Sequence, residues 1–93
     1  MNYFLVERVL PGMTRASLAA LQRALREATR RLSSPNAAVR YVASVYVPRR
    51  QTCLCLFKAE DAALVRKANE TAQAPFTSIQ EAVALFEDTG AEP

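Results

Sequence analysis

The chain contains no histidine and no tryptophan, and it has only two glycines and two cysteines. Without histidine, the sequence excludes Ser–His and Cys–His nucleophile pairs, and it lacks the side chain most often used for acid–base chemistry. Because the only glycines are Gly12 and Gly90, no glycine-rich loop can cradle a phosphate. No apolar run approaches the ~20 residues that a membrane-spanning helix needs. These absences remove several common functional classes before any motif is considered.

The 93 residues are enough for one small domain, and 12 basic against 9 acidic side chains leave a net charge of +3. This weak, dispersed charge does not indicate a nucleic acid or a membrane as partner. A monomer of this size buries only about 60–65% of its unfolded surface, so a homodimer is expected. The start Met1-Asn2-Tyr3 shows no signal peptide, and we therefore expect a cytoplasmic protein with reduced thiols.

Hydrophobic periodicity predicts the order strand, helix, strand, strand, helix, strand. The expected strands cover 2–10, 37–47, 52–58 and part of 77–86, although 80–86 could also form a helix. The expected helices cover 15–32, with Thr14 as N-cap, and about 61–72. Right-handed crossovers then give an α+β ferredoxin-like βαββαβ sandwich, a four-stranded antiparallel sheet with two helices on one face. We expect one domain over 1–87 and a flexible tail over 88–93.

The second face of this sheet is left open, and alternation along the strands indicates which side chains it holds. On the first strand, we assign to the open face Tyr3, Leu5, Glu7 and Val9. On the second strand, the set expected beneath the helices is Val39, Tyr41, Ala43, Val45 and Val47. The set expected on the open face is Arg40, Val42, Ser44 and Tyr46. Large apolar groups among a few charges are typical of a sheet that docks on a second sheet, as in a dimeric α/β barrel.

Cys53 and Cys55 share one face of the third strand and could supply half of a soft-metal site, with a dimer supplying the rest. They point the same way along the strand, which is a poor geometry for a disulfide between them. No third ligand is near in sequence, so the simpler interpretation is that both are small buried hydrophobic residues. The sequence predicts no cofactor.

Glu7 lies in an apolar strand, where burial would raise its pKa and suit it to acid–base catalysis. Glu81, in the last expected strand, could share its face. The residues that could bind the polar end of a small molecule in an apolar cavity are Tyr41, Ser44, Tyr46, Arg40 and Glu81. For all of them, ion pairing or ordinary packing is the alternative.

Arg23, Arg26 and Arg30 line one face of the first helix, either as a solvated basic face or as an anion-binding stripe. An RNA-binding use of this fold needs exposed aromatic side chains in a glycine-containing third strand. The third strand here has only Phe57 and no glycine, which excludes that use.

Several segments resemble a known family. They are Phe4-Leu-Val-Glu-Arg8, Leu10-Pro-Gly-Met-Thr14, Tyr46-Val-Pro48 and the stretch 52–59 before Glu60-Asp61. From Phe4 to about Val83 the chain is similar to the domain of unknown function 4242 family, whose relatives are described as nickel-binding or nickel-responsive. The resemblance implies a ferredoxin-like fold and a dimer with facing sheets. Because imidazole, a leading nickel ligand, is absent, any metal site would have to use Glu7, Cys53, Cys55 or Glu81.

The leading hypothesis is a cytoplasmic homodimer that binds a small molecule in a cavity between the sheet and the helices. The first alternative is a cofactor-free tailoring enzyme of the isomerase, cyclase or monooxygenase type, with Glu7 as acid or base, by analogy of fold. The second alternative is metal binding through Cys53, Cys55 and carboxylates.

Overall fold

The computed structural model describes residues 1–86 and contains six elements in the predicted order. The strands are β1 (Asn2–Val9), β2 (Val39–Val47), β3 (Thr52–Ala59) and β4 (Ser78–Ala82), and the helices are α1 (Arg15–Leu32) and α2 (Ala62–Thr71). In the ambiguous segment after residue 77, residues 78–82 form a strand and residues 83–86 form neither a strand nor a helix. The expected tail, 88–93, lies outside the described residues.

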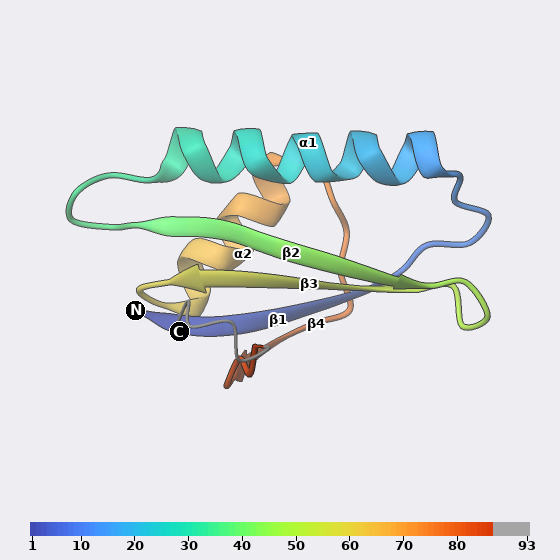
Figure 1. Ribbon diagram of the computed structural model, residues 1–93. Helices are drawn as coiled ribbons and strands as arrows, with labels where there is room; N and C mark the ends of the chain where they lie inside the picture. Colours follow the sequence, from blue (N-terminus) through green and yellow to red (C-terminus); the bar gives the residue numbers. More distant parts are fainter. Residues whose placement is uncertain (87–93) are drawn as a thin grey trace.

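The four strands form one antiparallel sheet in the order β2-β3-β1-β4. Both helices cover the same face of this sheet, and α1 runs along the length of β2 (Figure 1). The α+β ferredoxin-like prediction is thus confirmed. Neither helix, among residues 1–86, is long and apolar enough to cross a bilayer.

Local signals explain where α1 begins and ends. Thr14 accepts a hydrogen bond from the Ser17 main-chain nitrogen at 3.0 Å, and the Ser17 hydroxyl accepts one from the Thr14 nitrogen at 2.8 Å, which completes a capping box. The turn before the helix contains Gly12, whose φ of +65° is costly for other residues. At the other end, Arg30 and Arg31 interact favourably with the negative end of the helix dipole, and the helix stops at Leu32.

The core lies between the helices and the inner face of the sheet. On β1, Phe4, Val6 and Arg8 are buried beneath the helices. The inner face of β3 is also buried, and its residues are Cys53, Cys55, Phe57 and Ala59. The assignment of the alternate β1 residues, Tyr3 to Val9, to the open face is therefore confirmed.

The prediction for the faces of the second strand holds at its start and is wrong beyond it. A β-bulge between Tyr41 and Ala43 changes the register, so Tyr41 opposes Phe57 whereas Ala43 opposes Leu56. One extra residue reverses the alternation of all following side chains. The residues moved to the open face are Ala43, Val45 and Val47, and those moved to the helix side are Ser44 and Tyr46.

Candidate functional site

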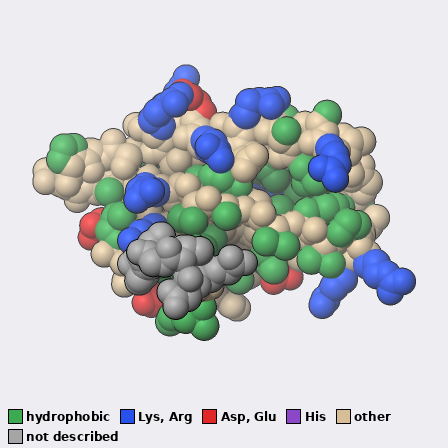
Figure 2. Space-filling view, viewed as in Figure 1, with side chains coloured by type: hydrophobic (Ala, Val, Ile, Leu, Met, Phe, Trp, Pro, Cys, Tyr) green, Lys and Arg blue, Asp and Glu red, His purple; other side chains and the backbone are tan. Residues whose placement is uncertain are grey.

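A partly enclosed cavity of about 160 Å³ lies between α1 and the sheet. From α1 it is lined by Leu18, Leu21 and Gln22, and from the sheet by Ser44, Tyr46 and Cys53. We call this space the α1–sheet cavity. Figure 2 shows hydrophobic side chains gathered between α1 and the sheet, below the basic side chains that lie over α1.

The bulge in β2 is what places polar groups in this cavity. It turns Ser44 and Tyr46 toward α1, opposite Cys55 and Cys53 of β3. The Tyr46 hydroxyl donates to the Leu10 carbonyl oxygen at 2.7 Å, which uses its proton and leaves its oxygen free to accept. Tyr46 is therefore held in one orientation and offers an acceptor to a ligand.

A chain of polar contacts connects β2 with the two buried thiols. The hydroxyls of Tyr41 and Ser44 are 2.6 Å apart, and the Ser44 hydroxyl donates to the Cys55 Sγ at 3.0 Å. The Cys55 Sγ lies 3.7 Å from the Cys53 Sγ, and both cysteines are free. Because the Ser44 hydroxyl donates its one proton to sulfur, the Tyr41 hydroxyl must donate to Ser44. The hydrogen bonds therefore run in one direction, from Tyr41 through Ser44 to Cys55.

Burial keeps the Cys53 thiol protonated. Its pKa rises from 9.0 to about 11, first because burial disfavours the thiolate and then because the Cys55 thiol adjoins it. The positive charge of Arg8 and the hydrogen bonding of Ser44 act in the opposite direction without cancelling the rise. Near neutral pH, Cys53 therefore presents a neutral, weakly polar sulfur to the cavity and not a nucleophilic thiolate.

The predicted catalytic residue lies on the other side of the sheet. Glu7 is exposed on the open face, opposite Leu54, and does not line the α1–sheet cavity. The expectation that Glu81 shares its face is wrong: Glu7 opposes Ser78 whereas Glu81 opposes Phe4, so the two carboxylates lie on different faces. The structure does not bring them together.

The predicted ligand-binding residues divide among three places. Ser44 and Tyr46 line the α1–sheet cavity, and Tyr41 contacts Ser44. Arg40 lines a separate surface hollow, and Glu81 is exposed on the edge strand β4. Cys53 lines the cavity although the sequence suggested it only for metal binding or packing.

Sequence reasoning missed the α1 part of the lining. Leu18, Leu21 and Leu25 recur at spacings of three and four residues and form an apolar stripe along α1, and Gln22 lies directly beside that stripe. A polar, uncharged side chain next to an apolar stripe is a weak signal that could have drawn attention to Gln22. The missing step was knowing which part of α1 lies over the bulged end of β2.

Fold and cavity together define a small ferredoxin-like α+β protein with a cavity between one helix and the sheet. The family model described as nickel responsive protein SCO4226-like matches residues 4–82, and the chain belongs to this family. This confirms the resemblance to a nickel-responsive family, while the numbered domain label stays untested.

A solved structure shows the same fold. The crystal structure of SCO4226 from Streptomyces coelicolor A3(2) matches with a TM-score of 0.77 at 19% sequence identity, covering 90% of this chain and 99% of that chain. No curated protein matches the chain.

Proposed function

We propose that this protein binds a small organic molecule in the α1–sheet cavity. The observation that carries the proposal is the lining, in which two leucines of α1 face the polar groups of Ser44, Tyr46 and Cys53. An apolar surface with a few oriented polar groups is typical of small-molecule sites. The volume of about 160 Å³ resembles that of an engineered cavity of about 150 Å³ that binds benzene, so a ligand with one ring fits.

The polar lining also indicates which ligand groups are favoured. Tyr46 offers an acceptor because its proton is given to Leu10, and the Gln22 amide offers both a donor and an acceptor. None of the lining side chains is charged, and Cys53 stays neutral because its pKa is raised. The part of the ligand inside the cavity is therefore a neutral ring with a hydroxyl or amine donor directed at Tyr46.

Titration of phenol into ¹⁵N-labelled protein tests this proposal. Amide shifts should concentrate on cavity residues such as Leu21, Ser44 and Cys53. Leu21→Phe fills the cavity and should abolish these shifts. Leu64→Phe makes the same change at a half-buried position of α2 outside the cavity lining, and it should preserve them. Shifts spread over the whole surface, or equal shifts in both variants, would contradict the proposal.

Within this proposal, binding is favoured over catalysis by Glu7. The Glu7 carboxylate lies on the open face, whereas a ligand in the α1–sheet cavity lies on the helix side. A general acid or base must come within hydrogen-bond reach of the reacting group. Through the sheet, Glu7 cannot meet this condition for a ligand in the cavity.

We also propose that a second copy of the chain covers the open face, which gives a homodimer. The support is the set of large apolar side chains that the open face presents, namely Leu5, Val45, Val47, Leu54 and Leu56. Single apolar side chains scattered over the surface are normal on a monomer, whereas a contiguous apolar patch of this kind marks an interaction surface. A cytoplasmic location stays a prediction from the sequence.

The family description mentions nickel, but the side chains of this chain do not suit a nickel site. The chain has no histidine, and no group of three or more Cys, Asp or Glu side chains in the described part of the chain could hold a metal ion. A second candidate function, binding of a soft metal ion by Cys53 and Cys55, is nevertheless favoured by one distance. The 3.7 Å between the two sulfurs is close to the roughly 3.8 Å that two thiolates span on a tetrahedral ion with bonds of about 2.3 Å. Copper(I) and zinc are the ions that thiolates select.

Metal analysis of protein purified without a histidine tag tests this second function. One equivalent of copper or zinc, lost in the Cys53→Ser, Cys55→Ser double variant, would support it. A control with Ser44→Ala keeps both sulfurs and should keep the metal. Metal-free protein after incubation with both ions under reducing conditions would exclude it.

A further inference from the structure

A second hollow, of about 360 Å³, opens where the C-terminal half of α1 faces the edge strand β2. Its lining includes Arg26, Arg30 and Ser33 at the end of α1, and Arg40 and Tyr41 of β2. We call it the arginine hollow. The strand register puts Arg40 on the open face of the edge strand β2, so Arg40 contributes to the hollow only around the edge of the sheet.

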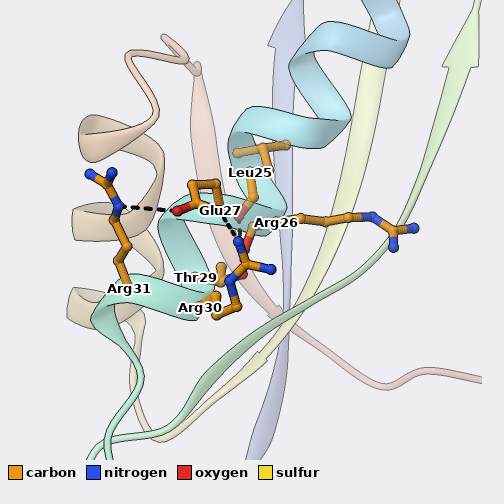
Figure 3. A network of polar contacts seen from close by, with 6 residues as sticks. All are labelled: Leu25, Arg26, Glu27, Thr29, Arg30 and Arg31. Atoms are coloured by element: carbon orange, nitrogen blue, oxygen red, sulfur yellow. Dashed lines mark hydrogen bonds and ion pairs between the residues drawn. The ribbon is translucent and has the colours of Figure 1, made fainter.

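Within residues 1–86, Arg26 and Arg40 form no ion pair with an acidic side chain. The ion pairs described for residues 1–86 join Glu27 to Arg30 and Arg31 (Figure 3). The Arg26 guanidinium instead lies 5.7 Å from the centre of the Tyr41 ring, and its side chain leaves α1 in a different direction from those of Arg30 and Arg31 (Figure 3). In the described part of the chain, the charges of Arg26 and Arg40 are thus not neutralised by a carboxylate.

The arginine hollow and the α1–sheet cavity are neighbours. Tyr41 lines the hollow and Ser44 lines the cavity, and their hydroxyl oxygens are 2.6 Å apart. On α1, Gln22 of the cavity and Arg26 of the hollow are four residues apart, about 6 Å along the helix axis. One small ligand can therefore contact both spaces.

We propose that the arginine hollow is an oxyanion site, and that the ligand is a one-ring molecule with a phosphate or similar oxyanion bound by Arg26 and Arg40. The position of the ring rests on the proposed function, whereas the anion site rests on the arginines. Guanidinium groups bind phosphate oxygens through paired, charge-assisted hydrogen bonds. A phosphate monoester, with a charge of about −1.5 to −2 at neutral pH, matches the two positive charges of Arg26 and Arg40.

Inorganic phosphate is the first probe, titrated at low ionic strength into ¹⁵N-labelled protein. Saturable amide shifts are expected around Arg26, Ser33 and Arg40. Arg26→Gln and Arg40→Gln should each weaken binding about tenfold, the loss expected for a hydrogen bond to a charged group. Arg23→Gln removes an exposed arginine of α1 that does not line the hollow, and it should leave binding unchanged. An absence of saturable shifts, or an equal loss in Arg23→Gln, would overturn the anion site.

Phenyl phosphate is the second probe, and it tests the link between the two spaces. It should bind at least about tenfold more tightly than inorganic phosphate, because the ring adds burial in the cavity. Leu21→Phe should remove this gain and leave binding of inorganic phosphate intact. If phenyl phosphate binds no more tightly than inorganic phosphate, the proposal that one ligand occupies both spaces is overturned, whereas the anion site is retained. The failure of phenol to bind would count against the cavity alone.

Discussion

Arg8 on β1 and Asn69 on α2 are joined by a buried hydrogen bond of 2.6 Å between guanidinium Nη2 and amide Oδ1. Arg8 is 1% exposed, and its Nη1 also donates to the carbonyl oxygens of Ala74 and Pro75 at 2.9 and 3.3 Å. None of the ion pairs described for residues 1–86 includes it. These acceptors lie at and just beyond the C-terminal end of α2, where carbonyl groups and the helix dipole are negative. The end of a helix therefore stabilises this charge in place of a carboxylate.

Arg8→Met should lower the free energy of unfolding by about 3 kcal/mol, because it leaves buried acceptors of the α2 end without a donor. Urea unfolding measures the loss. The matched control is Arg23→Met, at an exposed arginine, which should change stability by no more than about 0.5 kcal/mol. Equal stability of the two variants would show that the buried contacts of Arg8 contribute nothing.

The raised pKa of Cys53 predicts a loss of stability in alkali. Below about pH 9 the thiol is protonated in both the folded and the unfolded chain, and the stability that it contributes is fully present. As the pH rises from 9.0 to about 11, the unfolded chain loses the proton first, so the free energy of unfolding falls. The loss is on the order of 2–3 kcal/mol.

Urea unfolding at about pH 8 and about pH 10.5 measures this slope. Cys53→Ala removes the thiol, and the difference between its slope and that of the unchanged protein isolates the contribution of Cys53 from other groups that titrate in alkali. Identical slopes would refute the prediction.

Gln73→Gly should stabilise the protein by about 1 kcal/mol. Gln73 directly follows the C-cap of α2 and has a φ of +56°, a conformation that glycine adopts without steric cost. Thermal unfolding should show a higher midpoint. The same change at Gln80, an exposed residue within strand β4, should instead lower it. A lower midpoint for Gln73→Gly would mean that its side chain makes contacts that outweigh the backbone strain.

Leu54→Lys should dissociate the proposed homodimer. Leu54 lies on the open face between Glu7 and Val45 of the neighbouring strands, where a second copy would bury it. Light scattering should show the mass of two chains for the unchanged protein and a single 10.3 kDa chain for the variant. Ala63→Lys, on an exposed position of α2, should remain dimeric. A monomeric mass for the unchanged protein at micromolar concentration would refute the dimer.

The order of elements could be predicted because its signals are local. The apolar stripe of α1, the cap at Thr14 and the turn at Gly12 each act within a few residues, and the structure keeps all of them. The open-face assignment on β1 was also correct, since a regular strand alternates without exception over its length.

The candidate site depends on features that local signals do not encode. No glycine or proline in the sequence indicates the β2 bulge, yet the bulge turns Ser44 and Tyr46 toward α1. The sequence suggested both as ligand-binding residues while placing them on the wrong face. The arginine hollow likewise needs α1 and β2 to be adjacent before Arg26 and Arg40 can share a lining.

The sequence by itself determined the α+β ferredoxin-like order and the lack of imidazole chemistry, because these follow from residue types and short-range periodicity, and the resemblance of several segments indicated the family. Only the tertiary structure decided that Arg8 is buried against Asn69, 61 residues away, and that Glu7 lies across the sheet from the cavity. Such relationships depend on register and packing between distant segments. A single-residue shift in register is invisible in composition but reverses which side chains meet.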